Sequence, residues 1–304
     1  MNFTYPTFYF ICFFSTIACL PHYGNRLTKF NRTQPAIKVL PDDSCLHYSW
    51  MKNSIPVRTI KNDITLPHGY QRIPVESCSF AAWLRNLPLK KDGALVHLYD
   101  NTLKNNQSIH EAVINLDVGN RDLQQCADAV MRLRGEYLFS QHHFRKIHFK
   151  YTNGENISFS TWMKGNFPKV IGDKVQWVSN PANDNSYGSF RRYMDNIFMY
   201  AGSASLSGEL ISIPFQNMHI GDVLIIGGHP GHAVIVLDMA VNIRTGEKIF
   251  IIAQSFMPAQ EMHILKNLSN NQLSPWYSLK RSNKINTPEW TFDQSDLKRF
   301  SVRD

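Results

Sequence analysis

The segment Gly221–Asp238, GDVLIIGGHPGHAVIVLD, constrains the fold more than any other part of the chain. Glycine and proline at positions 227 to 231 separate two apolar runs, and residues of this kind mark tight turns between strands. The second run begins at His232. The sequence therefore predicts two buried strands joined by a tight turn, with an imidazole fixed at the head of the second strand.

The N-terminal residues predict export. With 304 residues, 43% of them apolar, the chain is large enough for one sizeable core. Phe8–Leu20 carries no charge and is shorter than the roughly 20 residues that span a bilayer, which favours a secretory signal in residues 1–23. Thr16–Cys19 resembles a lipoprotein cleavage box, so Cys19 is a candidate lipidation site and membrane anchor. Ordinary cleavage near Pro21 is the alternative. Either route leads to the periplasm or the cell envelope.

Removal of this signal leaves Cys45, Cys78 and Cys126. Three cysteines form at most one disulfide within a chain, so at least one thiol stays free in an oxidising compartment, through burial or for catalysis. The net charge of +8 suits an anionic envelope or lipid surface. Lys and Arg form no stripe with interleaved aromatics, which argues against a nucleic-acid partner. We expect neither a cofactor nor a metal.

The remaining patterns predict a polar tether over 24–63 and a single α+β domain over 64–304, in which helices precede an antiparallel sheet. Helical spacing predicts a helix capped by Ser77, a helix from Asp122 to about Tyr137 with Cys126 inside it, and a helix over 190–201. Strands are predicted at 96–99, 112–118, 146–152, 222–226, 232–241, 248–255 and 262–265. Residues 153–187 are predicted to form a long loop that carries Trp162 and Trp177.

These elements bring candidate catalytic residues together. A thiol becomes a nucleophile when a histidine and a helix N-terminus favour its deprotonation. The dipole favours Cys78, in the first turn of its predicted helix, over Cys126. Antiparallel pairing places Gln254 near the start of the His232 strand, where its amide can orient the imidazole. Asp238 lies roughly 20 Å along that strand and is too distant to do so.

The chain order is similar to that of NlpC-type and CHAP-type cysteine peptidases and amidases, which have a papain-like core. A closer resemblance is to a family of bacterial exported proteins and lipoproteins known as domain of unknown function 4846. It is carried by SFAAWLRNLPLK at 79–90, DLQQCADAVMRLRGEYL at 122–138, GDVLIIGGHPGHAVIVLDMA at 221–240, AQSFMPAQEMHILKN at 253–267 and SPWY at 274–277. The family pattern has a glycine where this chain has Cys78, so the resemblance selects Cys126 as the motif cysteine.

The leading hypothesis is an envelope cysteine hydrolase or amidase that acts on peptide or amide bonds, with cell-wall peptide as substrate. Cys126 would attack, His232 would transfer the proton and Gln254 would hold the ring. The plain alternatives are a core cysteine at Cys126 and a buried amide at Gln254 that only satisfies a backbone group. Gln124 or Gln125 is an oxyanion donor or a helix-surface residue.

Two other classes of function stay open. The first is a non-enzymatic envelope lipoprotein that binds glycan or peptide through Trp162 and Trp177, on a degenerate papain-like scaffold. The second is a metal site, which would use His229 and His232 with His263 or Asp238. In the plain alternative to the metal site, His229 faces solvent.

Overall fold

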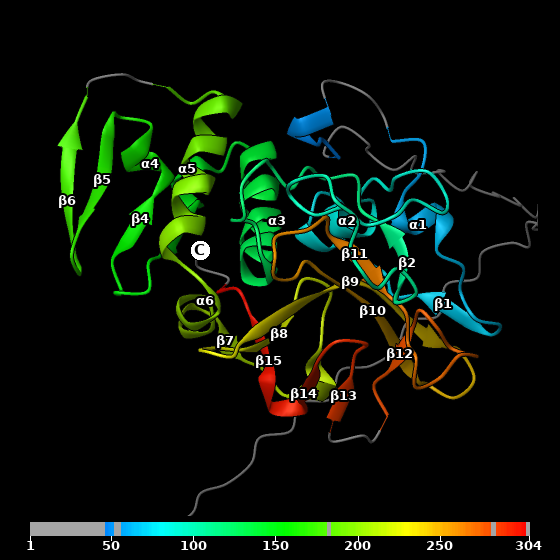
Figure 1. Ribbon diagram of the computed structural model, residues 1–304. Helices are drawn as coiled ribbons and strands as arrows, with labels where there is room; N and C mark the ends of the chain where they lie inside the picture. The colour runs from blue at the N-terminus through cyan, green and yellow to red at the C-terminus, as the bar shows by residue number, and fades with distance from the viewer. Residues whose placement is uncertain (1–45, 52–55, 181–183, 281–283, 302–304) are drawn as a thin grey trace, which may run out of the picture. The chain divides into compact units, whose positions relative to one another are not determined.

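The structure is a computed structural model that describes residues 46–51, 56–180, 184–280 and 284–301 (Figure 1). These residues belong to one compact unit, which spans Pro41–Asp304. The predicted signal, Cys19 and Cys45 lie outside the described residues. In the part of the chain that is described, no helix combines the length and the apolar character that a bilayer crossing requires.

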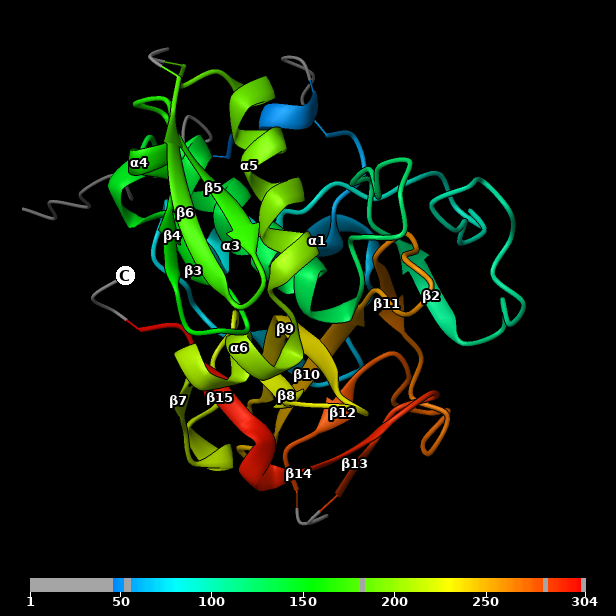
Figure 2. The same cartoon turned by 60° about the vertical axis from the view of Figure 1, so that its left-hand side comes forward.

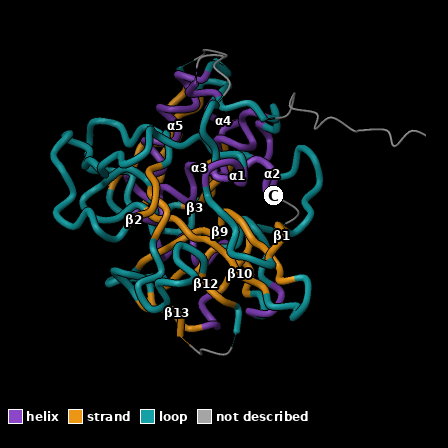
Figure 3. The backbone as a smooth tube through the Cα atoms, turned by 90° about the vertical axis from the view of Figure 1, so that its right-hand side faces the viewer, coloured by secondary structure: helices purple, strands orange, loops and turns teal. Residues whose placement is uncertain are grey.

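A sheet of nine strands forms the centre of this unit (Figures 1 and 3). Seven strands lie side by side in the order β2 (His110–Val113), β11 (His263–Leu265), β10 (Lys248–Gln254), β9 (His232–Asn242), β8 (Val223–Ile226), β15 (Leu297–Arg299) and β7 (Ile211–Ser212). The other two are β1 (Tyr70–Arg72), which pairs with β9, and β12 (Tyr277–Ser278), which pairs with β10. All these pairings are antiparallel, which confirms the predicted α+β class.

Helices and three small hairpins complete the unit. The hairpins are β3 (His148–Lys150) with β4 (Asn156–Ser158), β5 (Asn166–Ile171) with β6 (Lys174–Ser179), and β13 (Lys284–Asn286) with β14 (Thr291–Asp293). The α-helices are α1 (Ile60–Asp63), α2 (Phe80–Arg85), α3 (Cys126–Ser140), α4 (Phe159–Trp162), α5 (Tyr187–Tyr200) and α6 (Ser203–Glu209). Short 3₁₀ turns are η2 (Ser49–Met51), η3 (Phe144–Lys146), η4 (Phe215–Asn217) and η5 (Gln294–Asp296).

The sheet is covered on both faces, which explains why β9 is apolar at nearly every position. Successive side chains of a strand point to opposite faces. Ala233 and Ile235 join the larger core cluster, which includes residues of α2, α3 and α5, whereas Val234 and Val236 join a second cluster with Phe292 of β14. Figure 1 shows α3 and α5 on one side of the sheet and β13–β14 on the other. His232 begins a strand that is buried from both sides.

The helix starts differ from the predicted ones. The cap of α2 is Ser79, not Ser77, because the Ser79 hydroxyl accepts the Ala82 N–H at 3.1 Å. The helix predicted to start at Asp122 begins at Cys126, after the cap residue Gln125. The Asp128 carboxylate accepts the Gln125 N–H at 3.0 Å and closes this end of α3. Cys126 is therefore the first residue of α3 rather than a residue four positions inside it.

The segment predicted as a long loop is largely ordered. It forms β4, α4 and the β5–β6 hairpin, which lie beside α5 (Figure 2). The signal missed was Gly172 and Asp173, a two-residue hairpin turn between alternating strands in which Ile171 pairs with Lys174. The predicted strand at 96–99 instead makes single bridges, from His97 to Leu103 and from Leu98 to Gln260.

The folded part also begins earlier than residue 64. Tyr48 and Ile60, both inside the predicted tether, are buried in the larger core cluster. The Tyr48 hydroxyl donates to the Trp83 carbonyl at 2.9 Å. Sparse apolar residues in a polar stretch are thus sufficient to dock it, because Tyr48 packs on Trp83 of α2 and Ile60 is buried in the same cluster.

Candidate functional site

Cys126 is the free one of the two cysteines in the described residues. It occupies the first position of the 15-residue helix α3 and is partly buried against the larger core cluster. Burial raises the pKa of its thiol, the Ala233 N–H opposes that rise, and the nearby Asp128 adds to it. The thiol therefore lies close to the backbone of β9, at the residue that follows His232.

Cys78 is disulfide-bonded. It lies two positions before the first residue of α2 and has a positive φ of 62°. Cys78 is therefore not the nucleophile that its predicted place in the helix suggests, because a disulfide sulfur carries no thiolate and Cys78 lies outside the first turn of α2.

The glycine turn before β9 fixes the position of His232. A Cβ at Gly231 would lie 2.4 Å from the Ser203 Oγ and 2.5 Å from the Gly228 carbonyl oxygen, distances that no side chain tolerates. The turn is thus packed against the first residue of α6, and His232 pairs with Ile226 of β8. The ring lies 5.2 Å from that of Trp290 and 4.8 Å from that of Phe256. His232 is 1% exposed.

A chain of polar contacts runs away from the His232 ring. His232 Nε2 lies 2.8 Å from Gln254 Oε1. The Gln254 amide donates to Glu289 Oε2 at 2.5 Å, and Lys104 Nζ donates to Glu289 Oε1 at 2.7 Å. Lys104 lies in the loop before β2, and Glu289 lies in the β13–β14 turn. The sequence predicts no role for either residue. Glu289 stands beside Trp290 between two short strands, and a single charged residue in a turn does not indicate a site.

The structure brings Cys126 to the backbone beside His232 and brings Gln254 to the His232 ring, but among the described residues no hydrogen bond joins the thiol to the imidazole. Burial, as the largest cause, lowers the pKa of His232 to about 4, although Gln254 and Glu289 oppose that shift. Since the thiol pKa is raised, both groups are neutral near pH 7. The thiol and the imidazole are therefore two neutral groups, not a preformed ion pair.

Residues before α3 are held firmly by a buried ion cluster. Arg132, fully buried, donates to Glu136 Oε1 at 2.6 Å and to Gln124 Oε1 at 2.8 Å. The Ser255 hydroxyl donates to the Gln124 carbonyl at 3.1 Å, which ties this segment to the end of β10. The Gln124 amide donates to the Asp117 carbonyl. Gln124 is therefore a positioning residue, and both the nitrogen and the oxygen of its side-chain amide are hydrogen-bonded within the protein.

Asp128 makes the stability of this helix end depend on pH. Burial raises its pKa to about 8, well above the ordinary value of 3.8. The folded state thus holds this proton more tightly than the unfolded chain, and the resulting contribution to stability is lost as the pH rises towards 8. Between pH 5 and 8, we expect the free energy of unfolding to decrease less steeply with pH in Asp128→Asn than in the wild type, by about 1.4 kcal/mol per pH unit.

Urea unfolding of Asp128→Asn and the wild type at pH 5, 6, 7 and 8 measures this difference. Asp195→Asn, at an exposed ion pair with Arg121, is the matched control. If the free energy of unfolding depends on pH in the same way in the wild type and in Asp128→Asn, Asp128 is ionised in the folded protein.

The residues considered for a metal site are dispersed. His229 is exposed in the turn, whereas His232 and His263 are buried. Asp238 is fully buried and accepts bonds from Arg72 Nε and Arg85 Nε, both at 2.6 Å. No group of three or more His, Cys, Asp or Glu suited to a metal ion occurs in the described part of the chain. Asp238 is an internal anchor between β9, β1 and α2.

The two tryptophans proposed to bind ligand have different surroundings. Trp162 is buried at the end of α4, with its ring 4.7 Å from that of Phe167 and 5.8 Å from that of Tyr193. Trp177 is 41% exposed on β6, opposite Pro168. Only Trp177 therefore presents a surface to solvent, and Trp162 supports the packing of α4 on α5.

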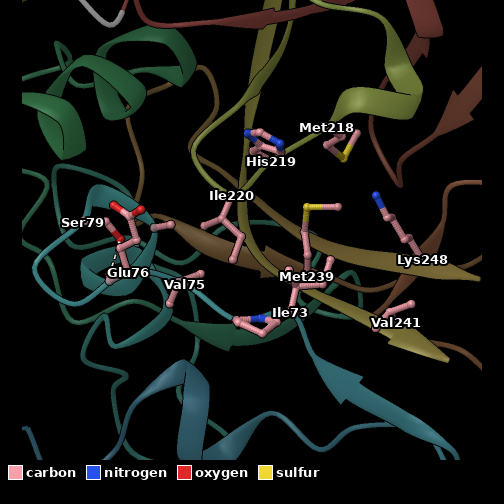
Figure 4. Close-up of a pocket in the computed structure, with 12 residues that line it drawn as sticks. Ile73, Val75, Glu76, Ser79, Met218, His219, Ile220, Met239, Val241 and Lys248 are labelled. Atoms are coloured by element: carbon pink, nitrogen blue, oxygen red, sulfur yellow. Dashed lines mark hydrogen bonds between the residues drawn. The ribbon is translucent and has the colours of Figure 1, made fainter. Parts of the chain in front are cut away.

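A cavity of about 520 Å³ lies at the other end of β9 (Figure 4). Lys248 and Glu76 lie on opposite sides of it, with Ile220 and Met239 between them. Met239 is seven positions from His232, roughly 23 Å along an extended strand. Neither Cys126 nor His232 is among the described residues that line it, so this cavity is separate from the thiol and the imidazole.

Fold and site together define an α+β protein with a thiol at a helix start, next to a strand headed by a buried histidine. The chain belongs to the family described as Domain of unknown function (4846), whose model matches residues 60–299. This confirms the resemblance of the sequence to that family of unknown function. Comparisons with curated proteins and with solved structures gave no match.

Proposed function

We propose that this protein is a cysteine hydrolase or amidase that acts on peptide or amide bonds. The observation that carries the proposal is the convergence of three elements at one strand start: Cys126 at the beginning of α3, the Ala233 backbone beside its sulfur, and the His232 ring held by Gln254. A thiol at the start of a 15-residue helix gains from the helix dipole as it ionises.

In the proposed reaction, His232 takes the proton from Cys126 as the sulfur attacks the carbonyl carbon. The free N–H groups in the first turn of α3 are the proposed donors to the developing oxyanion. His232 returns the proton to the leaving amine, and water releases the acyl group from the sulfur. Catalytic hydrogen bonds often tighten only when substrate binds, and the reaction requires such tightening between Cys126 and His232.

The proposed setting is the bacterial cell envelope, with peptidoglycan stem or cross-bridge peptides as substrate. The apolar run at 8–20 and the net charge of +8 support this setting. We also propose that the domain has a papain-like core, because a helix-borne cysteine precedes a histidine-headed antiparallel sheet. A second candidate is a non-enzymatic envelope protein that binds glycan or peptide; the 1% exposure of His232 and the exposed Trp177 favour it.

Cys126→Ala tests the proposal. Wild-type protein is incubated with purified peptidoglycan and with a panel of peptide amides, and new amino groups are quantified. We expect release by the wild type and a loss of at least about 10³-fold in Cys126→Ala. Equal release by both proteins, or none by either while labelled peptide binds at Trp177, would support the binding protein instead.

The pH dependence of alkylation tests the state of the thiol. Burial raises the pKa of the Cys126 thiol above its ordinary value of 9.0. We therefore expect the rate of modification by iodoacetamide to keep increasing as the pH rises beyond 9. Peptide mapping by mass spectrometry assigns the label to Cys126. A rate that is constant from pH 5 to 8 would reveal a preformed thiolate and contradict the neutral pair.

A further inference from the structure

We propose that Glu289, paired with Lys104, determines which nitrogen of His232 carries the proton, by fixing the orientation of the Gln254 amide. Glu289 and Lys104 are positioning residues in this account, since neither touches the thiol. The inference rests on the proposed function only for its catalytic consequence; the position of the proton can be measured in a protein without activity.

The hydrogen-bonding capacity of each group fixes the orientation of the Gln254 amide. An ionised carboxylate only accepts hydrogen bonds, so the group of Gln254 that lies 2.5 Å from Glu289 Oε2 must be its NH₂. The Gln254 carbonyl oxygen then faces His232 Nε2, at 2.8 Å. A carbonyl also only accepts, so Nε2 must carry the hydrogen. In a neutral imidazole the other nitrogen, Nδ1, is then the base.

Lys104 supplies the charge that this arrangement needs. Its side chain is 8% exposed, its Nζ lies 2.7 Å from Glu289 Oε1, and it lies over the Phe256 ring. Lys104 Nζ donates to Glu289 Oε1, so the second oxygen of the same carboxylate, Oε2, faces the Gln254 amide as an acceptor.

The chemical consequence is a defined path for one proton. The S–H bond of Cys126 breaks as an N–H bond forms at Nδ1, and the sulfur electron pair forms the bond to the carbonyl carbon. The positive charge on the ring is then held through Nε2–H and Gln254 towards Glu289. The proton on Nδ1 next passes to the amide nitrogen as its bond to the carbonyl carbon breaks, which leaves the acyl group on the sulfur and restores the neutral ring.

NMR of the ¹⁵N-labelled full chain at pH 7 measures the tautomer directly, with the His232 signals identified by their loss in His232→Gln. In the wild type we expect a protonated Nε2 and an unprotonated Nδ1. A wild-type ring protonated at Nδ1 would overturn the inference without any variant at Glu289. The same spectrum in Cys126→Ala separates this outcome from failure of the proposed function, because the tautomer does not depend on turnover.

Glu289→Gln tests the cause. A neutral amide at 289 can donate or accept, so we expect the Nδ1-protonated form of His232 to appear, and kcat to fall about 10²-fold with KM unchanged. Glu289→Asp should retain more of the Nε2-protonated form of His232 than Glu289→Gln does. Lys104→Met should increase the Nδ1-protonated form, as Glu289→Gln does. Asp293→Asn, at an exposed ion pair of the same hairpin, is the matched control. An unchanged tautomer in Glu289→Gln would refute the role of Glu289.

Discussion

His232→Ala is expected to lower kcat/KM for amide hydrolysis by about 10³-fold, within the range of a lost general acid and base. The reason is that the raised thiol pKa leaves Cys126 protonated near pH 7, so attack requires a base beside it. The depressed His232 pKa keeps the ring neutral and able to accept that proton. Activity should therefore persist down to about pH 5 and fall only as His232 titrates near pH 4.

Initial rates with the best substrate of the panel, measured from pH 4 to 9, check this prediction. His229→Ala is the matched control, because it is an exposed histidine in the same turn. It should retain wild-type kcat/KM. Loss of activity in His229→Ala, with activity retained in His232→Ala, would identify His229 as the base and contradict the proposed mechanism.

Asp238→Ala should be the most destabilising single change of those considered, with about 3–5 kcal/mol lost from the free energy of unfolding. The carboxylate is fully buried, accepts bonds from Arg72 and Arg85 and also accepts the Met239 N–H at 2.8 Å. Its removal leaves the Arg85 guanidinium, whose side chain is 7% exposed, without its counter-charge. Breaking one side of a buried pair costs far more than the intact pair contributes.

Guanidinium unfolding followed by circular dichroism measures the effect. Asp195→Ala, which removes an exposed partner of Arg121, should cost less than about 1 kcal/mol. A cost for Asp238→Ala as small as that of the control would mean that water replaces the carboxylate at the two arginines.

The strands around His232 were predictable because their signals are local. Glycines 227, 228 and 231 mark the turn, and two apolar runs mark β8 and β9. Pairing across the next turn then brings Gln254 near His232, and the structure shows their hydrogen bond. The predicted boundaries of β8, β9 and β10 differ from the observed ones by one residue or less.

The residues that hold the Gln254 amide could not be predicted from the sequence, and the reason is physical. Lys104 and Glu289 are 185 positions apart and lie in a loop and a turn, where no periodicity constrains which side chains meet. The starts of α2 and α3 were misjudged because several residues before each helix can cap it. Tertiary contacts such as those of Gln124 with Arg132 and Ser255 fix α3 at Cys126.

The position of the β13–β14 turn orders the assembly of the site during synthesis. Cys126, His232 and Gln254 leave the ribosome before Glu289 and Trp290 do. A nascent chain therefore carries the thiol and the imidazole before it carries the carboxylate that bonds Gln254 and the indole that lies against the His232 ring. Under the proposed function, a chain that has not yet reached Glu289 lacks the residue that fixes the proton on the His232 ring.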